Sequence, residues 1–238
     1  MTGRALAVIV PVLNEAANLP SLARNLGAAV SRETEILLVD GGSQDDTVAV
    51  AEAHGLAIIV SAPGRARQMN AGAAATRAPV LLFLHADTHL PMGADARVHD
   101  ALKGQSGWGR FDVRIRGRSR VLLPLVAALM NQRSRLTGIA TGDQALFMRR
   151  ELFDAVGGFP DQPLMEDIEI SRRLGRITPP CCLRALVSTS GRRWEQNGAW
   201  RTILLMWHLR WLYWRGTPAQ TLAQRYNGQG GGRNPHAP

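Results

Sequence analysis

Residues 5–15 read ALAVIVPVLNE. Their first eight residues are apolar without alternation, which indicates a β-strand buried on both faces over Ala5–Val12. Similar runs return at Glu35–Asp40, Ala57–Ser61 and Pro79–His85. Stretches with helical character separate these runs. Alternating strands and helices predict an α/β fold with a mainly parallel central sheet flanked by helices.

The segments between these strands predict three helices. The first is expected over about residues 14–30, with Asn14 as its cap. The second is expected over about residues 45–54 and starts at Asp45 or Asp46. The third follows a polar loop at 64–70 and continues to Thr76. Ligands of parallel sheets bind beyond the carboxyl ends of the strands. The polar clusters of the sequence fall at these ends, which predicts a binding site there. These clusters are Asn14 with Glu15, Asp40, Arg65 to Asn70, and Asp87.

The formal net charge of +9 is unevenly distributed along the chain. Residues 107–150 and 177–238 carry +7 each, whereas residues 1–106 carry −2 and residues 151–176 carry −3. No helix-turn-helix, zinc-finger or RNA-recognition signature accompanies the basic blocks, so nucleic acid is not the expected partner. The positive charge is expected to face a diphosphate, an anionic membrane or an acceptor.

Cys181 and Cys182 are the only cysteines, and they are adjacent. A disulfide between neighbours would be strained, which favours a reduced, cytoplasmic protein.

Five large apolar residues near the C-terminus are spaced four and three residues apart, which places them on one face of a helix over Ala199–Trp214. They are Trp200, Leu204, Trp207, Trp211 and Trp214. Sixteen residues are too few to span a membrane comfortably. The stripe is expected to pack on the α/β domain, on a second copy of the chain, or on an anionic membrane surface, which would make the protein peripheral on the inner face of the membrane.

Three acidic positions have the best chemistry for a site, and each has a structural alternative. Asp40 opens Asp-Gly-Gly-Ser and is suited to bind a base or ribose, or to close a turn. Asp87 follows a strand and is suited to hold a divalent cation, with His85 and His89 as further ligands or as structural hydrogen-bonding groups. Glu166-Asp167 either caps a helix or supplies a general base.

Taken in order, these motifs resemble glycosyltransferase family 2 over about residues 5–175. The matching residues are Pro11–Glu15, Val39–Ser43 with Asp45 and Thr47, His85–Asp87, Gly157–Pro160 and Glu166–Asp167. The stretches at 64–70, 83–88 and 142–144 resemble a bacterial subgroup described as associated with radical-SAM or selenium-domain proteins or with arsenosugar synthesis.

The resemblance implies a GT-A fold and inverting transfer of a sugar from a nucleotide-diphosphate donor to a hydroxyl acceptor. It assigns Asp167 as the base with Glu166 beside it, and Asp87 as the ligand of Mg²⁺ or Mn²⁺. His85 stands where the family has the first Asp of Asp-x-Asp. The nucleotide-binding residues that it implies are Pro11, Asn14, Glu15, Asp40, Gly41, Arg65, Arg67, Asn70, Ala86, Asp87 and Arg193.

The domain prediction has three parts: a GT-A domain over residues 1–190, a Trp- and Arg-rich helical segment over 191–227, and a disordered tail over 228–238. Two other functions remain open at this point. A nucleotidyltransferase should have a Gly-rich basic loop after the first strand, which Pro11–Glu15 lacks. A noncatalytic nucleotide-sugar-binding protein would bind the donor without turnover.

Overall fold

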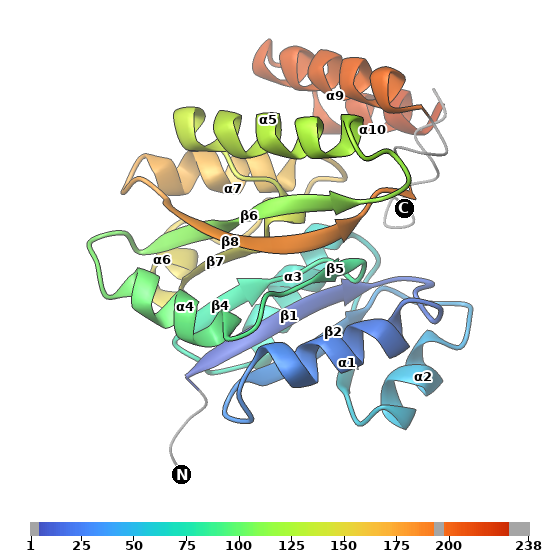
Figure 1. Ribbon diagram of the computed structural model, residues 1–238, viewed down its shortest axis with the longest axis vertical. Helices are drawn as coiled ribbons and strands as arrows, with labels where there is room; N and C mark the ends of the chain where they lie inside the picture. The colour runs from blue at the N-terminus through green and yellow to red at the C-terminus, as the bar shows by residue number, and fades with distance from the viewer. Residues whose placement is uncertain (1–4, 193–197, 229–238) are drawn as a thin grey trace.

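The computed structural model describes residues 5–192 and 198–228 of the chain. Its centre is an eight-stranded mixed sheet with helices on both faces (Figure 1). The predicted nucleotide contact Arg193 and the predicted tail beyond residue 228 lie outside the described residues.

The sheet confirms the predicted α/β class. The strands are β1 (Leu6–Val12), β2 (Glu35–Asp40), β3 (Ala57–Val60), β4 (Val80–Phe83), β5 (Thr88–His89), β6 (Trp108–Arg116), β7 (Leu146–Arg149) and β8 (Cys181–Ser190). Their order is β3-β2-β1-β4-β7-β6-β8-β5. The first four pair in parallel, as their apolar runs predict, whereas β7 pairs antiparallel to β4 with Leu146 opposite Phe83. The start of β7 therefore lies at the carboxyl end of β4.

Helices cover both faces of the sheet. They are α1 (Leu19–Ala29), α2 (Thr47–Ala53), α3 (Arg65–Ala75), α4 (Ala94–Leu102), α5 (Leu122–Thr137), α6 (Arg150–Ala155), α7 (Glu166–Gly175), α9 (Ala199–Trp214) and α10 (Ala219–Gly228). Buried residues of α1, α2, α4 and α5 pack on one face, and those of α3, α6 and α7 on the other. Successive residues of β1 alternate between these two cores.

Two predicted helix starts are wrong. Asn14 has a left-handed backbone (φ 55°) and does not cap a helix, because its Oδ1 instead accepts a hydrogen bond from the backbone N–H of Gln44 (2.8 Å) and α1 begins only at Leu19. The predicted loop at 64–70 is the first part of α3. Its Gln68 is fully buried and donates to the carbonyl oxygens of Val12 and Val39, 2.7 Å each, which ties the helix to two strand ends.

The helix over Ala199–Trp214 forms as predicted, but its stripe does not pack on the α/β domain. Leu204, Trp207, Trp211 and Trp214 are each more than half exposed. The other side of α9, centred on the buried Leu209, packs against α7 and α10 instead. The expectation that the stripe packs on the domain was therefore wrong, because the helix has a second apolar face that does so.

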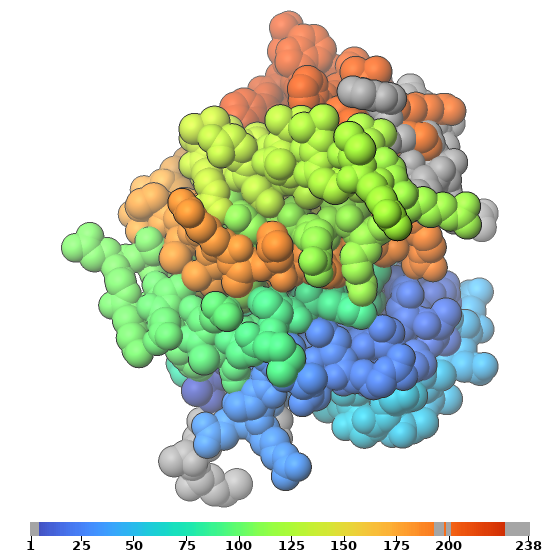
Figure 2. Space-filling view, in the orientation of Figure 1, coloured from blue at the N-terminus to red at the C-terminus, as the bar shows by residue number. Residues whose placement is uncertain are grey.

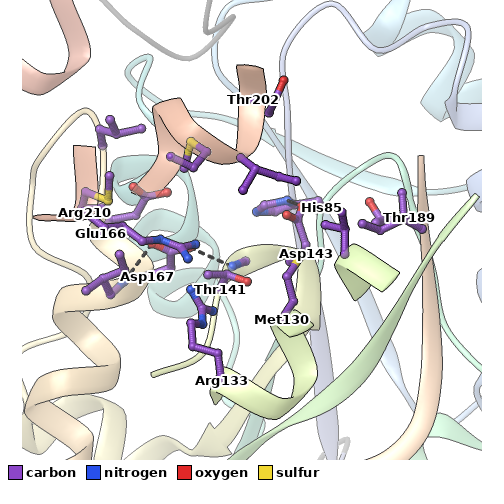
Figure 3. Close-up of a pocket in the computed structure, with 18 of the residues that line it drawn as sticks. His85, Met130, Arg133, Thr141, Asp143, Glu166, Asp167, Thr189, Thr202 and Arg210 are labelled. Carbon is purple, nitrogen blue, oxygen red and sulfur yellow. Dashed lines mark hydrogen bonds and ion pairs between the residues drawn. The ribbon is translucent and has the colours of Figure 1, made fainter. Parts of the chain in front are cut away.

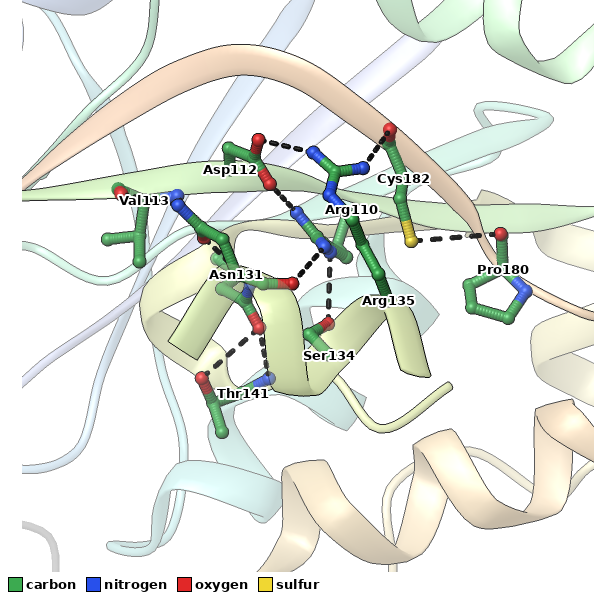
Figure 4. A network of polar contacts seen from close by, with 10 residues as sticks. Arg110, Asp112, Val113, Asn131, Ser134, Arg135, Thr141, Pro180 and Cys182 are labelled. Carbon is green, nitrogen blue, oxygen red and sulfur yellow. Dashed lines mark hydrogen bonds and ion pairs between the residues drawn. The ribbon is translucent and has the colours of Figure 1, made fainter. Parts of the chain in front are cut away.

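A buried polar network fastens α5 to β6 (Figure 4). Arg110 of β6 is fully buried and pairs with Asp112, which also pairs with Arg135 of α5. The Nε of Arg110 donates to Ser134 Oγ (3.0 Å), and Asn131 Oδ1 accepts from the backbone N–H of Val113 (2.9 Å). Because these donors and acceptors lie on both elements, they fix the position of α5 relative to the sheet.

Replacing Asp112 with Ala is expected to destabilise the chain by about 3–5 kcal/mol, because it leaves the buried Arg110 charge without its carboxylate. Chemical unfolding of both proteins measures the difference. The matched control is Asp100→Ala, whose carboxylate pairs with Lys103 on the surface and whose loss should leave the free energy of unfolding nearly unchanged. Equal effects of the two substitutions would contradict the role of the network.

Candidate active site

A cavity of about 900 Å³ lies at the carboxyl ends of β1 and β4. Its sheet side is formed by Pro11, Glu15, Ala86 and Asp87, and the 142–144 turn brings Gly142 and Asp143 to the same place. Arg65 of α3 and Glu166 and Asp167 of α7 complete this side (Figure 3). The cavity thus brings together seven of the residues that the resemblance implied: Pro11, Glu15, Arg65, Ala86, Asp87, Glu166 and Asp167.

The other predicted residues of the described chain are not among those that line the cavity. Both carboxylate oxygens of Asp40 accept hydrogen bonds from its own turn, including the backbone N–H of Gly42 (2.9 Å). Arg67 pairs with Asp161 (2.9 Å), and Asn70 bonds the backbone of Phe159 in both directions. Gly41 packs under Gln68. These contacts hold the loops beside the site, and the predicted nucleotide contacts by these residues and by Asn14 stay predictions.

Asp167 is a partly buried carboxylate at the start of α7. Its Oδ2 accepts from the backbone N–H of Gly142 (2.9 Å) and its Oδ1 from that of Ile168 (2.8 Å). Burial, together with the neighbouring carboxylate of Glu166, raises its pKa from 3.8 to about 6, against the effect of these two N–H groups and of Arg65. A carboxylate with a pKa close to neutral is suited to accept a proton in catalysis.

The turn before α7 holds the acidic pair in an unusual backbone conformation. Met165 is buried and left-handed (φ 67°), although it has a side chain that disfavours this region. The following Glu166 is buried and lies 3.5 Å from Nη1 of Arg65. The strained turn therefore sets the directions in which the side chains of Glu166 and Asp167 point.

His85 contacts the turn that contains Gly142 and Asp143. Its Nδ1 lies 3.3 Å from Oδ1 of Asp143, and a Cβ added to Gly142 would fall 2.2 Å from its Nε2. Only glycine fits at position 142, because the turn packs directly on the imidazole. His89 bonds Ser21 Oγ through Nε2 (3.2 Å). These contacts favour a role of both histidines as structural hydrogen-bonding groups.

Glu15 and Asp87 both line the cavity at the end of the sheet. Burial raises the pKa of Glu15, and the charge of Asp87 adds to this, while Asn18, Arg192 and His85 oppose it.

The sequence did not point to two other residues of the cavity. Arg133 of α5 and Arg210 of α9 line it from the side opposite the sheet (Figure 3). Their only signal in the sequence is that each belongs to one of the two basic blocks.

A family model described as Glycosyl transferase family 2 matches residues 7–156. The chain belongs to glycosyl transferase family 2. An uncharacterized glycosyltransferase of Mycobacterium tuberculosis is 35% identical over 94 residues, which cover 39% of this chain and 41% of the relative. The undecaprenyl-phosphate 4-deoxy-4-formamido-L-arabinose transferase of Klebsiella pneumoniae is 30% identical over 166 residues, covering 63% of this chain and 50% of the relative. The matches therefore span half or less of these relatives.

Two solved glycosyltransferase structures share the fold. TarS of S. aureus superposes with a TM-score of 0.61 at 17% identity, covering 79% of this chain and 61% of TarS. A mannosyltransferase of Pyrobaculum calidifontis, solved in complex with GDP-Man and Mn2+, has a TM-score of 0.60 at 21% identity and covers 77% of this chain and 56% of that one. The chain has a GT-A fold, as its motifs predicted.

Replacing Asp167 with Asn is expected to change the pH dependence of stability. A carboxyl with a raised folded pKa stabilises the folded state while protonated, and this contribution is lost as the pH rises through about 6. The free energy of unfolding of the variant, relative to the unsubstituted chain, should therefore rise by up to about 3 kcal/mol between about pH 4 and pH 8.

Chemical unfolding across this pH range measures the effect. Asp154→Asn, on an exposed position of α6, is the matched control and should give a flat difference. A flat difference for Asp167→Asn as well would show that its pKa is not raised.

Proposed function

We propose that this enzyme is a metal-dependent, inverting glycosyltransferase that moves a sugar from a nucleotide-diphosphate donor to a hydroxyl acceptor. The observation that carries the proposal is that Asp87, just beyond the carboxyl end of β4, and the partly buried Asp167 at the start of α7 line one cavity. These carboxylates belong to different elements and have different surroundings, which suits two separate roles.

The residues at the sheet end fit a divalent cation. Mg²⁺ in nucleotide enzymes is usually held by one or two carboxylates together with substrate phosphates. Asp87 offers carboxylate oxygens at this point, and within residues 5–192 and 198–228 no group of three or more His, Cys, Asp and Glu side chains could hold a metal ion. This donor set suits Mg²⁺ or Mn²⁺ shared with a diphosphate. When bound, the ion would neutralise charge on the departing diphosphate.

The side chains of the chain divide the remaining work. Arg65 and Arg192 line the cavity and supply positive charge for the donor. Asp167 receives the proton of the acceptor hydroxyl, whose oxygen forms a bond to the anomeric carbon. The bond from that carbon to the diphosphate breaks on the opposite side, and the diphosphate leaves with the electron pair. Each oxygen of Asp167 accepts one backbone hydrogen bond and keeps capacity for the incoming proton.

The exposed stripe of α9 supports peripheral contact with an anionic membrane. Trp207, Trp211 and Trp214 are exposed, and the guanidinium of Arg215 lies 5.1 Å from the ring centroid of Trp211. Tryptophan at headgroup depth with nearby arginine is typical of such contacts. A second copy of the chain would cover the same stripe. No helix in the described ranges is long and apolar enough to cross a membrane. The subgroup resemblance, with its arsenic or selenium setting, stays a prediction.

Asp87→Asn is expected to weaken Mn²⁺-dependent binding of a nucleoside diphosphate at least about tenfold, because it removes the charged oxygen ligand. Titration calorimetry with UDP and with GDP, each with Mn²⁺ or with EDTA, measures this loss. Asp154→Asn serves as control and should bind normally. Nucleotide binding that is indifferent to both Mn²⁺ and Asp87 would refute the metal site.

Asp167→Asn is expected to lower kcat about 100-fold or more while leaving nucleotide affinity nearly unchanged, because it removes a proton acceptor and not a donor contact. A screen of nucleotide sugars by thermal shift first identifies the donor, since binding to the folded state raises Tm. Turnover is then followed by release of the nucleotide, and NMR of the product reads the anomeric configuration. Normal turnover by the variant, or retention of configuration, would rule out the proposed chemistry.

A further inference from the structure

The imidazole of His85 lies between the end of β4 and the turn at Gly142–Gln144 (Figure 3). Its Nδ1 lies 3.3 Å from Oδ1 of Asp143, and a Cβ added to Gly142 would overlap the ring at Nε2 and Cε1. The side chain of His85 is only 18% exposed. Both ring nitrogens therefore face the turn, and a metal ion beside Asp87 would reach either of them only by displacing one of these contacts.

The same glycine also contacts the carboxylate of Asp167. Its backbone N–H donates to Oδ2 of Asp167 over 2.9 Å. Toward the core, His85, Gly142, Glu166 and Asp167 line a small cavity of about 10 Å³, so these four residues surround one point. Because Gly142 has the imidazole on one side and the carboxylate on the other, the position of the ring determines where its N–H points.

The N–H of Gly142 stabilises the charged form of Asp167, which is the form that accepts a proton. Burial and the neighbouring Glu166 raise the pKa of Asp167 to about 6, and the backbone N–H groups of Gly142 and Ile168 oppose this rise. The charged groups that face Asp167 from other elements are Arg65 of α3 and Arg133 of α5. These groups lie on helices and not on the turn, so a displacement of Gly142 acts on Asp167 mainly through the hydrogen bond.

The turn has other anchors besides His85. Thr141 and Gln144 form a capping box, and Nε2 of Gln144 lies 3.4 Å from Oδ1 of Asn131 on α5. Figure 2 shows α5 at the outer surface of the molecule, whereas His85 reaches the turn from the sheet. Loss of the imidazole should therefore shift the turn without unfolding it.

We propose that His85 is a positioning residue for Asp167: by packing on Gly142, it directs the backbone N–H of this glycine at the carboxylate and keeps the base charged and oriented. This inference rests on the proposed function and adds a residue to it. His85 acts through Gly142 and contacts neither the metal nor the reacting atoms.

The pKa of Asp167 tests this role without any turnover. Carbon-13 NMR of the aspartate carboxyl groups, titrated across the range around pH 6, gives this pKa, and Asp167→Asn identifies the signal. In His85→Ala the pKa of Asp167 should rise by at least about 0.5, because the carboxylate loses one of its two backbone donors. His54→Ala, at an exposed position just after α2, is the matched control and should leave this pKa unchanged. An unchanged pKa of Asp167 in His85→Ala would overturn the inference.

His85→Gln tests whether the packing of the side chain is what matters. Its amide reaches the place of the Nε2 atom and covers Gly142 again, so the pKa of Asp167 should return most of the way to that of the unsubstituted chain. A pKa of Asp167 as high as in His85→Ala would contradict a role through packing on Gly142.

Gly142→Ala tests the same contact from the other side. The new methyl group overlaps the imidazole and should push the turn away, so the pKa of Asp167 should rise although the ring of His85 remains. In His85→Ala the methyl group has room, so adding Gly142→Ala to that variant should raise the pKa of Asp167 much less than it does alone. Equal effects in the two backgrounds would show that the glycine and the ring are not coupled, which refutes the proposal.

Nucleotide binding and turnover separate this role from that of a metal ligand. His85→Ala should lower kcat about tenfold or more, while its affinity for UDP or GDP with Mn²⁺ stays within about twofold of that of the unsubstituted chain. His85→Asp offers oxygen ligands to a cation but lacks the ring, so its kcat should stay low. Weakened Mn²⁺-dependent nucleotide binding in His85→Ala that His85→Asp restores would assign His85 to the metal and overturn the inference.

Failure of this inference and failure of the proposed function give different results. If the unsubstituted chain binds neither UDP nor GDP and uses no nucleotide sugar, the proposed function fails, and the NMR titration still decides whether His85 positions the carboxylate of Asp167. If Asp167→Asn abolishes turnover but His85→Ala and Gly142→Ala keep a normal kcat and a normal pKa of Asp167, only the role of His85 fails.

Discussion

The antiparallel pairing of β7 with β4 is the constraint on which the rest of the site depends. It brings the turn before β7, which contains Gly142 and Asp143, to the carboxyl end of β4, where His85 and Asp87 leave the sheet. Gly142 then packs on His85 and donates its backbone N–H to Asp167. The antiparallel strand β7 thus joins the carboxyl ends of the parallel strands, where we propose the metal site, to the carboxylate of Asp167 on α7.

The opposite wall of the cavity depends on a second set of interactions. Asp112 between Arg110 and Arg135 fixes α5 on β6, and Leu209 anchors α9 against α7 and α10. With both helices held from behind, their remaining faces turn toward the cavity and the surface. Arg133, Arg210 and exposed apolar side chains of the two helices can therefore lie beside a polar site, because each helix is stabilised by contacts on its other side.

The strands and the acidic residues at their ends could be predicted because their signals are local. Apolar runs predicted the strands β1 to β4. Glu15 and Asp87 were predicted as site residues because they are polar and follow β1 and β4. The contacts that Asn70 and Arg67 make in the fold could not be predicted, since their partners, Phe159 and Asp161, lie about ninety residues away. Periodicity also identified the Trp stripe of α9 but not its environment, because a helical face has the same spacing whether it is buried or exposed. Arg133 and Arg210 were missed because only the tertiary fold brings α5 and α9 together.

A crystal structure with UDP or GDP and Mn²⁺ would decide whether this cavity is the site of sugar transfer. We expect an anomalous Mn²⁺ peak bonded to the Asp87 carboxylate and to the diphosphate, with the sugar-bearing side of the nucleotide directed toward Asp167. A nucleotide bound elsewhere, or a diphosphate seated with its metal away from Asp87, would contradict the assignment of this cavity as the site of sugar transfer.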